Sequence, residues 1–255
     1  MCLVLLAVDC HPRHRLIVAA NRDELYSRRT ARLSRWPGPA GIAAGVDLEG
    51  GGTWMAASRT GRFAAVTNYR DLRDLRPREP GELSRGALVR DFVEGALPPA
   101  EHLAALVPTM HLHRGFNLLV GDREGVYWLS NRSGDIVRLR PGFHGLSNHL
   151  LDTPWPKVEG GLADFRRVVE EQGDPDEEAL FRVLADSHVP PDDALPDTGV
   201  GLERERMLGP RFIRTPVYGT RCSTLLFAAS DGTTTLLERT HAPEPLGDAR
   251  VVLEG

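Results

Sequence analysis

Cysteine is scarce in this sequence, and lysine is almost absent. The cysteines are Cys2, Cys10 and Cys222, an odd number without the paired spacing of a zinc site, so the sequence predicts neither a disulfide framework nor a metal centre. Lys157 is the only lysine, and the arginines are scattered among acidic residues. The net charge of -4 and the lack of a basic stripe exclude nucleic acid as an expected partner.

Long apolar runs are missing as well. The run at 3–8 is too short for a transmembrane helix or a signal-peptide core, and no positively charged segment precedes it. We therefore expect no integral membrane segment and a cytoplasmic location. The 255 residues are 41% hydrophobic and 26% charged, which is typical of a globular protein, and the sequence has no internal repeat. We expect a single domain spanning residues 1–255.

The beginning of the chain predicts a β-hairpin. The apolar runs at 3–8 and 16–20 have the length and β-branched content of buried strands, and the turn between them is centred near Pro12. In such a hairpin the numbers of paired positions sum to about 24 to 26, which sets Cys2 opposite the segment 22–24.

Later segments predict strands in two groups, separated by helical patterns. Because strands and helices come in blocks, we expect segregated layers of an α+β fold rather than a regular βαβ alternation. Ser84 is the expected cap of the first helix, and Thr153 that of the longest one. The expected strands are 52–58, 63–68, 116–121, 126–130, 136–140, 224–229 and 233–238, and the expected helices are 85–93, 100–107, 154–172 and one that opens after 174–175.

Three consecutive glycines, Gly50, Gly51 and Gly52, raise the question of a phosphate-binding loop. They precede a strand instead of opening a helix, and no Lys-Ser or Lys-Thr follows them. We interpret them as a turn that permits close approach of the backbone to a pocket.

Cys2 follows the initiator methionine, and this position offers a particular chemistry. Removal of Met1 would leave a thiol and a free α-amine on one residue, with reference pKa values of about 8.5 and about 7.7 to 8.0. Nucleophile and base would then coincide without a separate histidine. The other interpretation is a small buried residue at the start of a strand.

Four polar residues, Asn21-Arg22-Asp23-Glu24, follow the second apolar run at the end that the hairpin places beside Cys2. Arg22 would favour a thiolate, and Asp23 would hold the α-amine or orient the arginine. The alternative is a solvated strand end with a surface ion pair.

Short motifs are spread along nearly the whole chain. They are Met-Cys at the start, Asn21-Arg22-Asp23-Glu24, Gly51-Gly52-Thr53-Trp54, Thr67-Asn68-Tyr69-Arg70, Ser84-Arg85-Gly86, Phe116-Asn117-Leu118-Leu119, Leu146-Ser147-Asn148, Thr153-Pro154-Trp155-Pro156-Lys157-Val158 and Tyr218-Gly219-Thr220-Arg221. In these motifs the sequence is similar to the NRDE family, also called the transport-and-Golgi-organisation family. That family resembles, more distantly, the N-terminal-nucleophile (Ntn) hydrolases of the choloylglycine hydrolase and penicillin V acylase group, which implies a four-layer αββα sandwich with an N-terminal cysteine nucleophile.

The resemblance carries site residues over by local context. It implies that Asn68 and Asn148 donate hydrogen bonds to an oxyanion, and that Arg221 stabilises the thiolate or holds a substrate carboxylate. The hydrolases carry an arginine three residues before the aspartate, where this chain has Ala20, and the arginine here is Arg22. The complete expected set is Cys2, Arg22, Asp23, Asn68, Asn148 and Arg221 for catalysis, with Asn21, Glu24, Trp54 and Tyr69 for substrate binding.

Two functions follow as hypotheses. The first is an Ntn cysteine hydrolase that cleaves an amide or related acyl bond of a small molecule without a cofactor, and two flanking arginines would lower the pKa of its Cys2 thiol below about 8.5. The second is a non-catalytic protein that binds haem or a lipid-like ligand in the same cavity. Cys2, His149 and His241 are the available axial ligands for haem.

Overall fold

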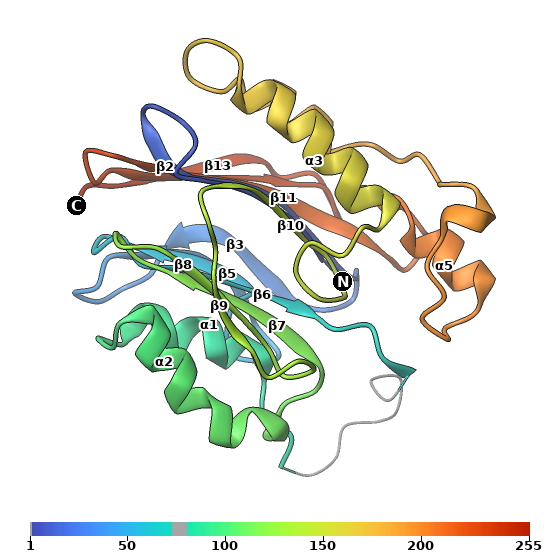
Figure 1. Cartoon of the computed structure of the whole chain (residues 1–255), viewed down its shortest axis with the longest axis horizontal. Helices are drawn as coiled ribbons and strands as arrows, with labels where there is room; N and C mark the ends of the chain where they lie inside the picture. The colour runs from blue at the N-terminus through green and yellow to red at the C-terminus, as the bar shows by residue number, and fades with distance from the viewer. Residues whose placement is uncertain (1, 73–80) are drawn as a thin grey trace.

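The computed structural model describes residues 2–72 and 81–255, and it is built of four layers. Two antiparallel sheets face each other, and helices cover the outer face of each, as Figure 1 shows. The first sheet has six strands in the order β10 (Gly142–Leu146), β1 (Cys2–Val8), β2 (His14–Leu25), β11 (Tyr218–Ala229), β12 (Thr234–Thr240) and β13 (Gly247–Leu253).

The second sheet has seven strands and carries the first pair of helices. α1 (Arg85–Glu94) and α2 (Pro99–Leu106) lie between β6 and β7 in the chain, followed by the 3-10 helix η2 (Val107–Leu112). Phe92 of α1 is fully buried against the outer face of this sheet. The strand order is β3 (Thr30–Arg35), β4 (Ile42–Asp47), β5 (Met55–Ser58), β6 (Phe63–Asn68), β7 (Phe116–Gly121), β8 (Val126–Ser130) and β9 (Ile136–Arg138).

The outer face of the first sheet is covered by α3 (Pro156–Val169) and α4 (Glu177–Leu184). Phe165 of α3 is fully buried there. A 3-10 helix, η3 (Asp192–Ala194), and α5 (Leu202–Leu208) follow before β11 begins. The arrangement confirms the α+β layers predicted from the sequence pattern and the αββα sandwich implied by the family resemblance. No helix in the described ranges is long and apolar enough to cross a membrane.

The side-chain alternation of β1 places Cys2 between the two sheets. Leu3 and Leu5 pack toward the helices, whereas Val4 and Leu6 pack toward the second sheet. Successive side chains of a strand point to opposite faces, so Cys2 shares the inner face with Val4. Burial on both faces explains why this strand is apolar without interruption.

The predicted hairpin register is confirmed, because Cys2 lies directly opposite Arg22 and the numbers of all paired positions sum to 24. The second strand is longer than expected and runs to Leu25. The polar segment 21–24 continues the strand because β1 pairs with it on one side and β11 on the other.

Other boundaries differ from the prediction. The longest helix starts at Pro156 with Trp155 at its cap position, and Thr153 instead donates to the carbonyl of Leu150 at 2.8 Å. A residue that precedes proline disfavours the helical conformation, which keeps Trp155 extended. Ser84 does hold the cap position of α1, but its side chain makes no capping hydrogen bond. Strands β3, β4, β10 and β13 were not predicted from the sequence.

Candidate active site

Cys2 begins a row of four side chains that crosses the first sheet. Cys2 lies opposite Arg22, Arg22 lies opposite Cys222, and Cys222 lies opposite Thr240. Directly opposed residues of antiparallel strands share a face, so the whole row faces the second sheet. Two strand spacings, roughly 9.5 Å, separate the backbones of the two cysteines, which is too far for a disulfide.

Cys2 opens into a pocket of about 580 Å³ between the sheets, hereafter the Cys2 pocket. Six of the ten residues that the sequence predicted for the site line it. Asp47, Thr53 and the start of α1 complete its wall. The six are Cys2, Arg22, Asp23, Glu24, Trp54 and Asn68.

The glycine-rich turn closes one side of this pocket. A β-carbon at Gly52 would lie 2.5 Å from the carbonyl oxygen of Gly86, so only glycine fits at this contact. The backbone of Thr53 donates to the same oxygen at 3.2 Å. This contact joins the start of α1 to the segment before Trp54, and it agrees with the interpretation of the glycines as a close-approach turn.

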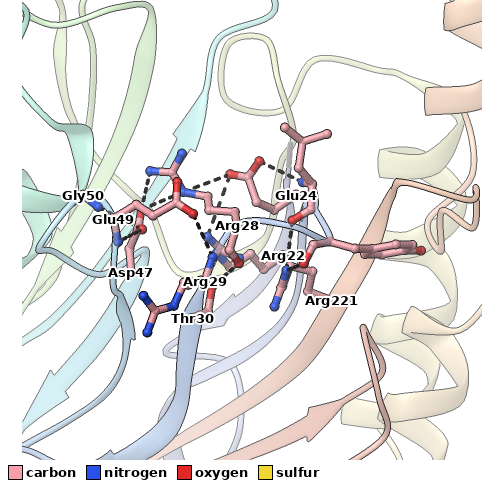
Figure 2. A network of polar contacts seen from close by, with 11 residues as sticks. Arg22, Glu24, Arg28, Arg29, Thr30, Asp47, Glu49, Gly50 and Arg221 are labelled. Carbon is pink, nitrogen blue, oxygen red and sulfur yellow. Dashed lines mark hydrogen bonds and ion pairs between the residues drawn. The ribbon is translucent and has the colours of Figure 1, made fainter.

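Several of the residues that line the pocket are charged, and Figure 2 shows the polar network that joins them. Arg28 binds Asp47 through Nη2 at 2.6 Å and Nε at 2.9 Å, and its Nε lies 3.7 Å from Glu24. Burial favours the protonated acid, but the hydrogen bond from Arg28 and the amide of Gly50 hold the pKa of Asp47 below its ordinary value. The pair therefore stays charged, and it orients Glu24 toward Arg22, 3.9 Å away.

The Cys2 thiol is buried, with 7% of the residue exposed. Burial raises the pKa of this thiol, the negative charge of Asp23 acts in the same direction, and Arg22 lowers it. The lowered pKa that the sequence predicted is therefore wrong for the chain that retains Met1. A neutral thiol in this position needs a base before it can act as a nucleophile.

Asp23 borders the Cys2 pocket, but it follows Arg22 along β2, so its carboxylate points to the helix-covered side of the sheet. It accepts a hydrogen bond from Thr220 Oγ1 at 2.7 Å, and only 2% of the residue is exposed. Burial raises the pKa of Asp23, whereas Lys157, the Thr220 hydrogen bond and Arg22 lower it.

Lys157 belongs to this environment, and the sequence reasoning missed it. Its ammonium is buried and donates to the carbonyl of Leu208 at 3.0 Å. Burial, together with Arg70, lowers the pKa of Lys157 to about 8, although Asp23 and Cys2 act against the shift. The signal was present: this is the only lysine of an arginine-rich chain, and it lies in one of the motifs.

Asn148 lies at the edge of the site and is fully buried. Its Nδ2 donates to the backbone carbonyl of Asn68 at 2.9 Å, and the hydroxyl of Ser147 donates to the carbonyl of Cys2 at 3.1 Å. Segment 147–148 thus joins the first residue of β1 to the last residue of β6. Because Nδ2 carries two hydrogens, one remains for another acceptor.

Four predicted residues do not line the Cys2 pocket: Asn148, described above, and Asn21, Arg221 and Tyr69. Asn21 faces the helices, where it donates to the carbonyls of Leu184 and Arg211 at 2.9 and 2.8 Å. Arg221 donates to the carbonyls of Leu25 and Tyr26 at 2.9 and 2.7 Å and lines a separate cavity. The ring of Tyr69 contacts that of His149 at a tilt of 38°, and Tyr69 lines the neighbouring groove described next.

An apolar groove adjoins the Cys2 pocket. It has a volume of about 1150 Å³ and shares Asn68 and Arg85 with that pocket. Leu25, Val217 and Met207 line it, and Val217 is 66% exposed. A molecule that reaches Cys2 could therefore extend an apolar group along this surface.

The candidate haem ligands do not converge. His149 bonds to Thr153 at 2.9 Å, and His241 bonds to Ser223 at 2.9 Å. Neither histidine lines the Cys2 pocket or the apolar groove. In the part of the chain that the structure describes, no group of three or more His, Cys, Asp or Glu side chains could hold a metal ion.

Comparison of the sequence with known proteins identifies a family. The chain is 33% identical to the human Transport and Golgi organization protein 2 homolog over 267 residues, covering 96% of this chain and 95% of that protein. It is 32% identical to the mouse Transport and Golgi organization 2 homolog over 266 residues, covering 94% and 92%.

A solved structure also matches. It is the Caenorhabditis elegans N-acylethanolamine-hydrolyzing acid amidase ortholog, with a TM-score of 0.50 and 16% identity, covering 88% of this chain and 92% of that one. This likeness shows a shared Ntn-hydrolase-like fold. The model of the family described as Transport and Golgi organisation 2 matches residues 1–243. The chain belongs to the Transport and Golgi organisation 2 family.

Proposed function

We propose that this protein is an N-terminal cysteine hydrolase that cleaves an amide or related acyl bond of a small molecule. The observation that carries the proposal is the position of Cys2. The residue is the first of a central strand, opposes Arg22, and opens into a pocket that also contains Asp23 and Asn68.

The proposed reaction uses groups of this chain alone. After Met1 is removed, the α-amine of Cys2 takes the thiol proton, and the thiolate attacks the substrate carbonyl. Asn68 and the remaining amide hydrogen of Asn148 donate to the oxyanion. Collapse of the intermediate expels the amine, which leaves with the proton from the α-ammonium. Water, deprotonated by the α-amine, then attacks the thioester, the C–S bond breaks, and the carboxylic acid is released. The Cys2 thiolate recovers its proton from the α-ammonium.

The buried charges beside Cys2 support this order of events. Burial raises the thiol pKa, so the thiol stays protected until its own amine is free to act as base. Asp23 is held by Thr220 at 2.7 Å on the helix-covered side of the sheet, where it would hold the α-ammonium form. Lys157 would balance its charge from the same side.

The test uses protein whose start at Cys2 has been verified by intact mass. We expect it to hydrolyse decanoyl 4-nitroanilide faster than acetyl 4-nitroanilide, because the apolar groove adjoins the pocket. Cys2→Ala should abolish the activity, whereas Cys10→Ala should leave it unchanged because Cys10 is exposed on another part of the surface. Hydrolysis by Cys2→Ala at the wild-type rate would overturn the proposal.

The apolar groove also favours a second candidate, a carrier that holds a lipid-like ligand without cleaving it. Its apolar lining and the exposure of Val217 suit a chain-like hydrophobic molecule. Haem suits the site less, because Cys2 is the only one of its three candidate ligands that lines the Cys2 pocket. Tight binding of cis-parinaric acid by a wild-type protein without hydrolytic activity would favour the carrier.

A further inference from the structure

A second cavity, hereafter the Cys222 cavity, lies at the far end of the row that begins with Cys2. It has a volume of about 540 Å³, and Arg22, Cys222 and Thr240 of the row line it. Arg22 and Trp54 line both this cavity and the Cys2 pocket, so these two side chains separate the two spaces.

Two polar atoms of the row lack a hydrogen-bond partner among the residues that the structure describes. They are Nη1 of Arg22 and Oγ1 of Thr240, two buried atoms of residues that line the cavity. Only 7% of the Arg22 side chain is exposed, and its nearest ion-pair contact, Glu24, lies 3.9 Å from Nη2. A buried cationic donor without an acceptor is destabilising, and an anionic ligand relieves that cost.

The charges around the cavity also favour an anion. Arg22, Arg32 and Arg221 line it, and Glu238 is the one carboxylate among its lining residues. The carboxylate of Glu238 accepts a hydrogen bond from the backbone amide of Leu33 at 2.8 Å. Burial raises the pKa of Glu238, which disfavours its charged form. The balance of charge at the cavity is therefore positive.

The remaining wall is apolar. Trp54, Val46 and Pro243 line the cavity, together with Leu246, which is 56% exposed. A ligand that fits both walls needs one anionic group and a compact apolar body. We propose that the Cys222 cavity binds a small apolar monocarboxylate, with its carboxylate between Arg22 and Thr240 and its apolar body against Trp54 and Leu246.

Benzoate is a suitable probe, and benzamide is its neutral counterpart of the same shape. We expect benzoate to bind the full-length protein saturably by isothermal titration calorimetry, and benzamide to bind at least about tenfold more weakly, since hydrogen bonds to charged groups are the stronger ones. Thr240→Val keeps the side-chain shape but removes the hydroxyl, so it should weaken benzoate binding on the order of tenfold and leave benzamide unaffected. Neither probe is cleaved, so the result does not depend on hydrolysis at Cys2.

Two further variants locate the ligand. Leu246→Asp places a negative charge at the exposed rim and should weaken benzoate binding without disturbing the core. Asn68→Ala alters the Cys2 pocket and the apolar groove but not the Cys222 cavity, so it should bind benzoate as the wild type does. Equal affinities for the two probes would overturn the proposal, as would wild-type affinity in both Thr240→Val and Leu246→Asp. Loss of binding in Asn68→Ala alone would place the anion in the Cys2 pocket and overturn it too.

Discussion

Asn148 donates a hydrogen bond from Nδ2 to the backbone carbonyl of Asn68 at 2.9 Å, so the two asparagines implied as oxyanion donors form one unit. Ser147, the preceding residue, binds the carbonyl of Cys2. The geometry of the proposed oxyanion site is thus tied to the position of the nucleophile itself, and a change at Asn148 affects both.

The first prediction tests this unit. Asn148→Ala removes one donor and releases the end of β6, so kcat for the hydrolysis of decanoyl 4-nitroanilide should fall roughly 100- to 1000-fold. Asn117→Ala is the matched control, because Asn117 is also fully buried and donates to Thr67 and to the carbonyl of His149. Both variants should lose stability in urea denaturation, but only Asn148→Ala should lose kcat. An equal loss of kcat in the two would show that the effect is structural.

The second prediction concerns Lys157 and the pH dependence of stability. Its pKa is about 8 in the folded protein and 10.5 as the ordinary value, so between these pH values the unfolded chain binds the extra proton. Stability contributed by this group therefore rises as pH increases from about 8 toward 10.5, by on the order of a few kcal/mol for the whole window.

Lys157→Met keeps the length of the side chain and removes the proton. The free energy of unfolding of the wild type, measured by urea denaturation, should rise relative to that of the variant between about pH 7.5 and pH 10. Arg211→Met is a suitable control, since it also replaces a largely buried cationic side chain with methionine. Parallel pH profiles for wild type and Lys157→Met would contradict a lowered pKa of Lys157 in the folded protein.

How far the sequence predicts this site depends on the range of the interactions involved. The opposition of Cys2 and Arg22 was predictable, because two apolar runs joined by one short turn leave little freedom of register. The face on which Asn21 lies follows from the same alternation, but its partners Leu184 and Arg211 are distant in sequence. Local pattern cannot supply such contacts.

Arg221 shows a different limit. The register of β11 against β2 shifts between Thr220 and Cys222, so Arg221 lies in an irregularity of the sheet. A bulge re-aims the side chain and has no reliable signature in a single sequence. The motif therefore predicted that Arg221 lies near the nucleophile, whereas in the structure it donates hydrogen bonds to the backbone carbonyls of Leu25 and Tyr26.

The third prediction concerns haem. His241 has a pKa lowered to about 4 by burial and by Arg239 and Arg214, so it is neutral at pH 7, but Ser223 occupies its Nε2. Titration of haem into the protein should give no saturable one-to-one shift of the Soret band. A stoichiometric shift that is lost in Cys2→Ala, His149→Ala or His241→Ala would instead identify an axial ligand and favour the carrier.

The last prediction separates the two arginines by their effect on the Cys2 thiol. Arg22 lies opposite Cys2 in the hairpin, and its charge lowers the pKa of the Cys2 thiol, whereas burial raises it. Arg221 lines the Cys222 cavity and donates a hydrogen bond to the carbonyl of Leu25 at the end of β2. Removing a nearby positive charge raises the pKa of a thiol, so Arg22→Gln should move the alkylation profile of Cys2 to higher pH.

Arg221→Gln should leave the Cys2 profile unchanged while lowering stability, because it loses its bonds to Leu25 and Tyr26. Iodoacetamide labelling between about pH 5 and pH 9, read by peptide mass spectrometry, measures every thiol in one sample. Exposed Cys10 is the internal reference, and buried Cys222, whose pKa burial raises well above its ordinary value, should label most slowly. If Arg221→Gln shifts the Cys2 profile as much as Arg22→Gln does, both guanidiniums act on the thiol, and the separation of the Cys222 cavity from the Cys2 pocket does not hold in solution.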